Sequence, residues 1–102
     1  MAEELSLESL REEIDKIDEV IVRLLDRRAR CAYAIGRVKK EQGLAIYEPK
    51  RESDVIARVK ALNIKLGGPL DEHAIGRLYE RIIDEARRIQ RIEAKHEPES
   101  LA

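Results

Sequence analysis

The sequence predicts an all-α protein of three helices, and two observations lead to this prediction. Charged residues make up 40% of the 102 residues and aromatic residues only 3%, so aliphatic side chains on amphipathic helices must supply most of the core. Apolar residues recur at helical spacing over three segments, which Gly43 and the glycines at 67 and 68 separate. We expect a single domain over residues 1–102, because the chain is too short for two.

The first helix is expected over about 6–42. Ser9 with Glu12 has the spacing of a capping box, and Gly43 suits the position directly after the last helical turn. Spacings of four and three residues alternate along this segment, as in a heptad seam, and Arg28 occupies one seam position. The other positions are apolar: Leu10, Ile14, Ile17, Ile21, Leu24, Cys31, Ile35 and Val38.

Two shorter helices are expected after the first. The second covers about 49–65, with Pro49 in its first turn and the sequence GGP beyond its end. The third covers about 71–94, where Asp71 is a candidate N-cap and isoleucine and leucine recur on one face. The polar tail at 95–102 is expected to fray.

The length of the first helix predicts an intertwined homodimeric helical bundle. A helix of about 35 residues is about 50 Å long, whereas a compact domain of this size has a radius of gyration of about 13 Å. Two shorter helices cannot cover such a seam. A second copy of the chain would bury it, so we expect a homodimer.

The charge distribution favours a small anionic ligand. Twenty basic residues against 21 acidic ones give a net charge of -1, which argues against binding to nucleic acid or to an anionic membrane. Residues 23–40, however, hold seven basic residues against one acid, Asp26. There is no apolar run of membrane-spanning length, no signal-peptide pattern and only one cysteine, so we expect a cytoplasmic protein.

Arg28 in the apolar seam has two interpretations. It can fix the register of a helix pair, or its stem can be buried while its head reaches water. Alternatively, the seam opens at this level into a pocket for an anion. Lys39 lies eleven residues further on, within about 20° of the same helix face and roughly 16 Å along it. Gly36 between them leaves room for a ligand or for tight helix packing.

The remaining polar candidates also have ordinary structural explanations. Arg51 and Glu52 lie in a charged first helical turn, which is commonplace. Gln90 lies at the border of the apolar face of the third helix, where it is either solvated or hydrogen-bonded. Cys31 is interpreted as a small buried apolar residue rather than a nucleophile. The two histidines, at positions 73 and 96, are expected on the surface, and no spacing indicates a metal site.

Three stretches taken together resemble the all-helical chorismate mutase family. They are LREEIDKIDEVIVRLLDRRARCAYAIGRVK, IYEPKRE and GPLDEHAIGRLYERIIDEARRIQ, in the order and spacing of that family. The resemblance runs from about Leu7 to Gln90, and YEPKRE and GPL look especially like mutase domains fused to prephenate dehydratase. It implies the Claisen rearrangement of chorismate to prephenate, on the route to phenylalanine and tyrosine, with no nucleophile, metal or cofactor.

The resemblance also implies roles for individual residues. Arg28 would bind one carboxylate of the dianionic substrate and Arg11 the other. Lys39 and Gln90 would donate hydrogen bonds to the ether oxygen, which gains negative charge as its C–O bond breaks. Charge-assisted and bidentate hydrogen bonds suit this task.

Four further positions complete the implied site. Glu52 would accept a hydrogen bond from the substrate hydroxyl, with Arg51 and Glu48 completing the polar wall. The family often has Asp at the position of Glu48 and Ser at the position of Ala86. We expect these two departures to tune the activity rather than abolish it.

Arg11 and Arg28 are too far apart on one helix to bind the same small ligand. Seventeen residues separate their Cα atoms by about 25 Å and by roughly 100° around the helix axis. In an antiparallel pair of long helices, however, Arg11 of one chain can lie beside Arg28 of the other, which agrees with the shared sites that the family resemblance implies. Both would then serve one site, shared between two subunits.

Two other functions compete with the mutase. An isochorismate-pyruvate lyase of the same fold would need a similar dianion pocket, although the PKRE stretch favours the mutase. A non-catalytic helical dimer with a regulatory or scaffolding role is the other. It predicts that Arg28→Ala or Lys39→Ala leaves function intact or even stabilises the fold.

Overall fold

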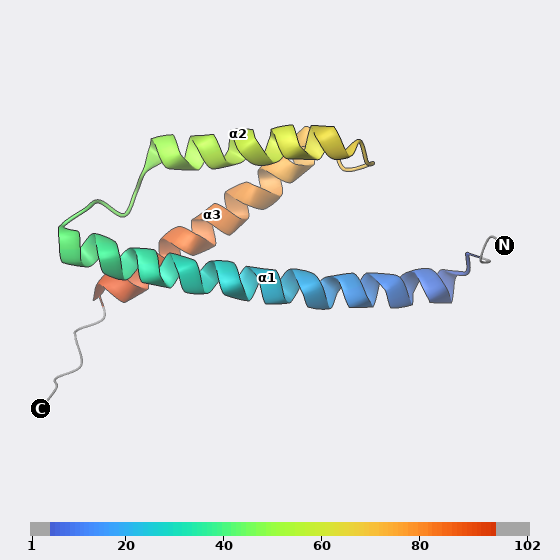
Figure 1. The fold of residues 1–102 in the computed structure, drawn as a ribbon, viewed down its shortest axis with the longest axis horizontal. Helices are drawn as coiled ribbons and strands as arrows, with labels where there is room; N and C mark the ends of the chain where they lie inside the picture. Colours follow the sequence, from blue (N-terminus) through green and yellow to red (C-terminus); the bar gives the residue numbers. More distant parts are fainter. Residues whose placement is uncertain (1–4, 96–102) are drawn as a thin grey trace, which may run out of the picture. The chain divides into compact units, whose positions relative to one another are not determined.

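The computed structural model describes residues 5–95 and contains three helices, α1 (Leu7–Gln42), α2 (Pro49–Leu66) and α3 (Glu72–Lys95) (Figure 1). No strand occurs in the described range, so the predicted all-α class and the three helices are confirmed. His96 and the tail at 96–102 lie outside the described residues. The chain divides into two compact units, one up to Cys31 and one from Ala32 onward; each is described by itself.

Two serines cap the start of helix α1, each accepting a hydrogen bond from the backbone N–H of the other. The Ser6 hydroxyl accepts a hydrogen bond from the Ser9 backbone N–H at 3.0 Å, and the Ser9 hydroxyl accepts one from the Ser6 N–H at 3.2 Å. This reciprocal arrangement is that of a capping box. The box therefore pairs Ser6 with Ser9, rather than Ser9 with Glu12 as expected, because the helix begins directly after Ser6.

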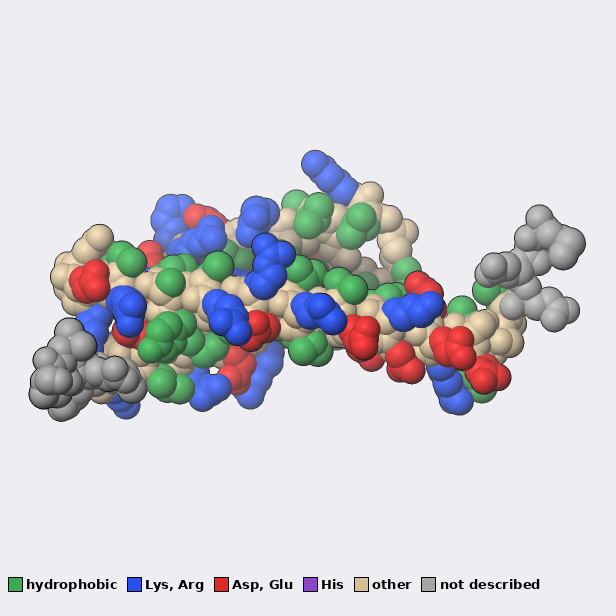
Figure 2. Space-filling view, turned by 60° about the horizontal axis from the view of Figure 1, so that its bottom comes forward, with side chains coloured by type: hydrophobic (Ala, Val, Ile, Leu, Met, Phe, Trp, Pro, Cys, Tyr) green, Lys and Arg blue, Asp and Glu red, His purple; other side chains and the backbone are tan. Residues whose placement is uncertain are grey.

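The first unit has no buried side chain among its described residues, 5–31. The seam residues Leu10, Ile14, Ile17, Ile21 and Leu24 are each 45% to 55% exposed. On the face that Figure 2 shows, acidic side chains gather toward the N-terminal end of α1 and basic side chains lie further along it. This part of α1 thus has an apolar stripe without a core of its own.

Cys31, at the end of the first unit, differs from its expected state. Its side chain is exposed, so the burial predicted for it does not occur within one chain. One turn earlier on the seam, Arg28 is half-buried. Arg11, near the start of the helix, is exposed.

Gly43 ends α1 as predicted. Its φ of 66° lies in the left-handed region that glycine adopts without strain. The Leu44 N–H donates to the Lys39 carbonyl at 2.8 Å, and the Gly43 N–H donates to the Lys40 carbonyl at 3.4 Å. These two bonds form a Schellman motif, which reverses the chain directly after the turn that carries Lys39.

Helix α2 starts and stops at residues suited to these positions. Pro49 occupies the first turn, while Glu48 at the N-cap makes no capping hydrogen bond with its side chain. Gly67 ends the helix with φ 64°, and its N–H donates to the carbonyls of Asn63 and Ile64. The Asn63 side-chain amide donates to the Leu70 carbonyl at 2.7 Å and so fixes the turn toward α3.

Asp71 is the N-cap of α3, as the sequence predicts. Its Oδ1 atom accepts a hydrogen bond from the Ala74 N–H at 2.7 Å. This bond lowers the pKa of the Asp71 carboxyl, because it stabilises the charged form. The cap sets where α3 begins.

The second unit contains the buried apolar side chains of the described chain. They are Ala32 from α1, Val55 and Val59 from α2, and Ile83 from α3. Helices α2 and α3 pack together near the turn that joins them and diverge toward the other end of α2 (Figure 1). None of the described helices has the length and apolar composition needed to cross a bilayer.

Candidate active site

Lys39 is a buried cation surrounded by three acceptors. Lys39 is only 6% exposed. The Nζ atom donates to the Ile46 carbonyl at 2.7 Å and to Oε1 of Gln90 at 2.8 Å, and it pairs with Oε1 of Glu48 at 2.8 Å. An ammonium has three N–H donors, so each donor has a protein acceptor.

Three elements bring these groups together. The Schellman motif at Gly43 turns the chain back, so that the loop 43–48 presents Ile46 and Glu48 to Lys39. Because its carboxylate pairs with Lys39, Glu48 does not cap α2 with its side chain. Helix α3 contributes Gln90.

Gly36 explains how Gln90 reaches Lys39. A Cβ atom at position 36 would lie 2.9 Å from the Gln90 Cα and 3.1 Å from its carbonyl oxygen. Helices α1 and α3 therefore touch through their backbones at Gly36, which lies one turn before Lys39. Of the two explanations for Gly36, tight helix packing is the one that the structure supports, because the Gln90 backbone fills the space.

The contact with Lys39 also fixes the orientation of the Gln90 amide. An ammonium can only donate, so the amide must turn its oxygen toward Lys39. The Nε2 group is then on the other side of the amide, where it can donate to a ligand. A donor cation and a donor amide thus lie next to each other.

Glu52 and Arg87 form a second polar pair between α2 and α3. Arg87 Nε donates to one carboxylate oxygen at 3.0 Å and Nη2 donates to the other at 2.8 Å. Both side chains are 22% exposed. Arg87 Nη2 also donates to Asp84 at 3.2 Å, and the guanidinium lies 5.3 Å from the centre of the Tyr47 ring. The hydrogen bonding to Glu52 raises the pKa of Arg87, so its positive charge persists.

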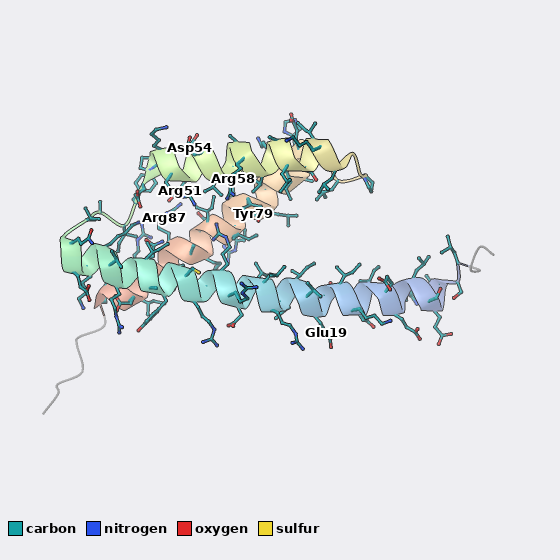
Figure 3. All side chains as sticks on the ribbon, in the orientation of Figure 1. Glu19, Arg51, Asp54, Arg58, Tyr79 and Arg87 are labelled. Carbon is teal, nitrogen blue, oxygen red and sulfur yellow. The ribbon has the colours of Figure 1, made fainter. Side chains whose placement is uncertain are left out.

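The other predicted site residues occupy different positions. Arg51 and Arg87 lie between α2 and α3 in Figure 3, and Arg51 is exposed in the first turn of α2. Ala86 is half-buried on α3. Arg11 and Arg28 belong to the first unit, so the second unit alone builds the cluster of Lys39, Glu48, Glu52, Arg87 and Gln90, which we call the polar cluster.

Arg87 and Tyr47 were not among the residues that the sequence predicts for the site. Arg87 follows the buried Ile83 by four residues and precedes Gln90 by three, so all three share one face of α3. An arginine four residues after a buried isoleucine and three residues before Gln90 is the sequence signal that could have identified Arg87. The Ile46 carbonyl has no such signal, because the backbone conformation of the loop decides where it points.

Another ion pair lies beside the contact between Gly36 and Gln90. Arg37 Nε is 3.6 Å from Oε1 of Glu93. The Glu93 residue is only 5% exposed, and its Oε2 atom has no hydrogen-bond partner among the described residues. This buried oxygen is an unfavourable feature of the fold.

The polar cluster suits a ligand that carries both hydrogen-bond acceptors and a hydroxyl group. It offers a buried ammonium, an amide donor and a carboxylate acceptor that an arginine holds in place. Within residues 5–95, no group of three or more His, Cys, Asp or Glu side chains could hold a metal ion. The groups present can bind, orient and stabilise developing charge.

Comparison with known families agrees with this site. Residues 10–91 match the chorismate mutase type II family. The chain belongs to that family. The bifunctional chorismate mutase/prephenate dehydratase of Aquifex aeolicus is 41% identical over 78 residues, which cover 76% of this chain and 22% of the relative. The protein of the same name from Neisseria gonorrhoeae is 40% identical over 81 residues, covering 79% of this chain and 21% of the relative. The chain thus spans about a fifth of the length of these relatives.

The fold is also similar to a solved chorismate mutase. The form II structure of the enzyme from Thermus thermophilus superposes with a TM-score of 0.78 and 34% sequence identity. The similarity covers 83% of this chain and 93% of the solved chain. The resemblance inferred from the sequence is therefore confirmed at the level of the family and of the fold.

Proposed function

We propose that this chain catalyses the rearrangement of chorismate to prephenate. The reaction is unimolecular: the C–O bond of the ether breaks while a C–C bond forms within the same molecule. The substrate is a dianion, and its ether oxygen gains negative charge in the transition state. A catalyst has to hold the compact reactive conformer and place donors at that oxygen.

The contact between Lys39 and Gln90 is the observation that supports this proposal. It places an ammonium beside an amide whose donor group is turned away from it. Donors fixed before the reaction begins stabilise developing charge most effectively, because they need not reorganise. Lys39 and Gln90 would both donate to the ether oxygen.

Lys39 must exchange one acceptor to make this bond. Its three present partners are the Ile46 carbonyl, Gln90 and Glu48. The side chain of Glu48 is 53% exposed, so water can solvate it when it leaves. In the proposed complex the ether oxygen takes the place of the Glu48 carboxylate on Lys39.

The remaining roles concern the substrate periphery. Glu52 would accept the hydrogen bond of the ring hydroxyl, and Arg51 would complete the polar wall with Glu48. Ala86 would line the pocket without a hydroxyl of its own. One carboxylate of the substrate would bind Arg28.

A homodimer with shared sites is part of the proposal, because the second carboxylate would bind Arg11 from the partner subunit. The exposed seam of the first unit supports it: five aliphatic side chains there are each 45% to 55% exposed within one chain. Monomeric soluble proteins rarely leave a continuous apolar stripe uncovered. A second copy would bury this stripe, and each subunit would contribute an arginine to the site of the other.

The direct test is turnover. Purified protein is mixed with chorismate, and formation of prephenate is followed against the spontaneous rate. We expect strong acceleration by the wild-type chain, loss of most of it in Lys39→Met, and little change in the control Lys40→Met. Isochorismate is offered separately. A wild-type rate equal to the spontaneous rate would refute the proposal, and pyruvate release from isochorismate with no prephenate would replace the mutase by a lyase.

Mixed dimers test the shared site. Arg11→Ala and Arg28→Ala are each expected to be inactive. When their subunits exchange, one site of the mixed dimer carries both substitutions and the other carries neither, so activity should partly return. Two folded variants that exchange subunits but regain no activity would show that each site is built from one chain.

A further inference from the structure

Glu52 is already bound before any substrate enters. Both of its carboxylate oxygens accept hydrogen bonds from Arg87, at 3.0 Å and 2.8 Å. The two residues lie 35 positions apart in the chain, and their side chains are only 22% exposed. This pair is more buried than the other arginine pairs of α3, in which Arg81 and Arg88 are 76% and 62% exposed.

We propose that Arg87 is a positioning residue of the mutase site, which holds the Glu52 carboxylate in one orientation as the acceptor for the substrate's ring hydroxyl. The inference rests on the function proposed above and assigns to it a residue and a basis for recognising the hydroxyl. Without Arg87, rotation about the side-chain bonds of Glu52 would spread the carboxylate over several positions.

The geometry leaves Glu52 able to accept more. A carboxylate offers about four lone-pair sites. A bidentate guanidinium engages one on each oxygen, so others on the same oxygens remain for a hydroxyl donor. Because Arg87 brings only donors, it cannot compete with the hydroxyl for the role of acceptor.

Arg87 itself is held on two sides. Asp84, one turn earlier on α3, accepts from Nη2 at 3.2 Å, and the centre of the Tyr47 ring lies 5.3 Å from the guanidinium carbon. Tyr47 directly precedes Glu48 in the loop that reaches Lys39. One short loop therefore contacts both cations of the polar cluster. The raised pKa of Arg87 means that its charge does not change over the ordinary pH range.

A direct role for Arg87 as an anion ligand fits the contacts less well. Nε and Nη2 carry three of its five N–H donors, and these point to Glu52 and Asp84. To bind a substrate carboxylate bidentately through Nη1 and Nη2, Arg87 would have to give up Asp84, and through Nε and Nη2 it would have to give up Glu52. Positioning needs no such exchange.

The test combines three substitutions and one control substitution with two substrates. Arg87→Met, Arg87→Lys and Glu52→Gln are compared with the control Arg88→Met. Arg88 is the neighbour of Arg87 in the chain, but it is exposed and pairs with Glu85 at 2.8 Å. Chorismate and an analogue without the ring hydroxyl are both assayed. We expect Arg87→Met to lower kcat/KM for chorismate by at least roughly tenfold, the factor for a lost hydrogen bond to a charged group. Arg88→Met should leave it unchanged.

Two further results separate positioning from a general structural effect. In a Glu52→Gln background, Arg87→Met should cause no additional loss, because it acts through Glu52. With the analogue that lacks the hydroxyl, Arg87→Met and wild type should be equal. Arg87→Lys keeps the charge without the bidentate fork and should fall between wild type and Arg87→Met. Helical circular dichroism verifies that each variant is folded.

Other outcomes overturn the inference. If Arg87→Met matches Arg88→Met on chorismate, Arg87 has no part in the site. If the loss persists with the hydroxyl-free analogue or in the Glu52→Gln background, Arg87 either binds substrate itself or supports the fold in general. An inactive wild-type chain would refute the proposed function and this inference with it, whereas an active wild type with an unaffected Arg87→Met would refute the inference alone.

Discussion

The Nζ atom of Lys39 lies 2.8 Å from Oε1 of Gln90, and this hydrogen bond joins the end of α1 to α3. Its chemical importance is the direction that it imposes on the amide. Since the ammonium accepts nothing, Nε2 of Gln90 is the half of the amide left to donate. The donor that we propose for the ether oxygen is thus oriented by the other proposed donor.

The first prediction concerns pH. Gln90 donates in one protonation state at all ordinary pH values, so wild-type kcat/KM should change little between mildly acid and mildly alkaline solution. In Gln90→Glu the introduced carboxyl donates only when protonated, so activity should fall as pH rises and be roughly 100-fold below wild type in alkaline solution. Parallel pH profiles of the two proteins, or a collapse of wild-type activity above neutrality, would contradict the proposed role of the amide.

The second prediction concerns the glycine between the helices. Gly36→Ala places a methyl group 2.9 Å from the Gln90 Cα, which is backbone and cannot move aside cheaply. We expect a loss of about 1–3 kcal/mol in the free energy of unfolding and reduced turnover, because the strain displaces Gln90.

Gly76→Ala is the matched control for this change. The added methyl group there would meet the Lys60 Cε at 2.9 Å, but this atom ends a flexible side chain that can move. Alanine is also the better helix former, so Gly76→Ala should be neutral or stabilising by up to about 1 kcal/mol. Urea unfolding at one fixed protein concentration measures both. Equal effects at positions 36 and 76 would show that the backbone contact does not limit the site.

The third prediction uses the buried carboxylate of Glu93. The substitution Arg37→Met removes the ion pair of 3.6 Å and leaves the buried Glu93 carboxylate without a positively charged partner at position 37. We expect a destabilisation of about 1 kcal/mol, small because Arg37 is 63% exposed. Glu93→Met removes the unsatisfied oxygen and should stabilise the protein, and the double variant should resemble Glu93→Met. Thermal unfolding checks the order; a more stable Arg37→Met would refute it.

The fourth prediction concerns the start of α3. The folded state lowers the pKa of Asp71 through its bond to the Ala74 N–H. The carboxylate therefore stabilises the fold at pH values above its ordinary pKa of about 3.9, and this contribution is lost as pH falls through the lowered value. Asp71→Ala should unfold at a lower temperature than wild type at neutral pH. The difference should shrink in strong acid, and a difference that grows as pH falls would contradict the cap.

Much of the helix framework was readable in the sequence because local chemistry determines it. Gly43 ends α1 through backbone hydrogen bonds, and Asp71 begins α3 through a side-chain hydrogen bond, each to residues only a few positions away. The family resemblance indicated Lys39 and Gln90, and these two are in contact. Their roles in the reaction stay predictions, as do those of the other proposed residues.

The features that sequence reasoning missed depend on longer-range geometry. Arg87 meets Glu52 only because α2 and α3 pack together, and the Ile46 carbonyl reaches Lys39 only through the path of a loop. Cys31 was expected to be buried, yet one chain leaves it exposed. The seam pattern identifies an apolar face, but it does not specify whether the same chain or another one covers that face.

The pairing within the polar cluster has a consequence for ionic strength. Lys39 and Arg87 are matched by Glu48 and Glu52, so the cluster is electrically neutral as a whole. A dianion that enters brings two charges that only arginines outside the cluster can balance, namely Arg51 and, in the proposed dimer, Arg28 and Arg11. Added salt screens such contacts where they are open to water. The Michaelis constant should therefore rise with salt while kcat, which depends on the buried donors, stays nearly constant.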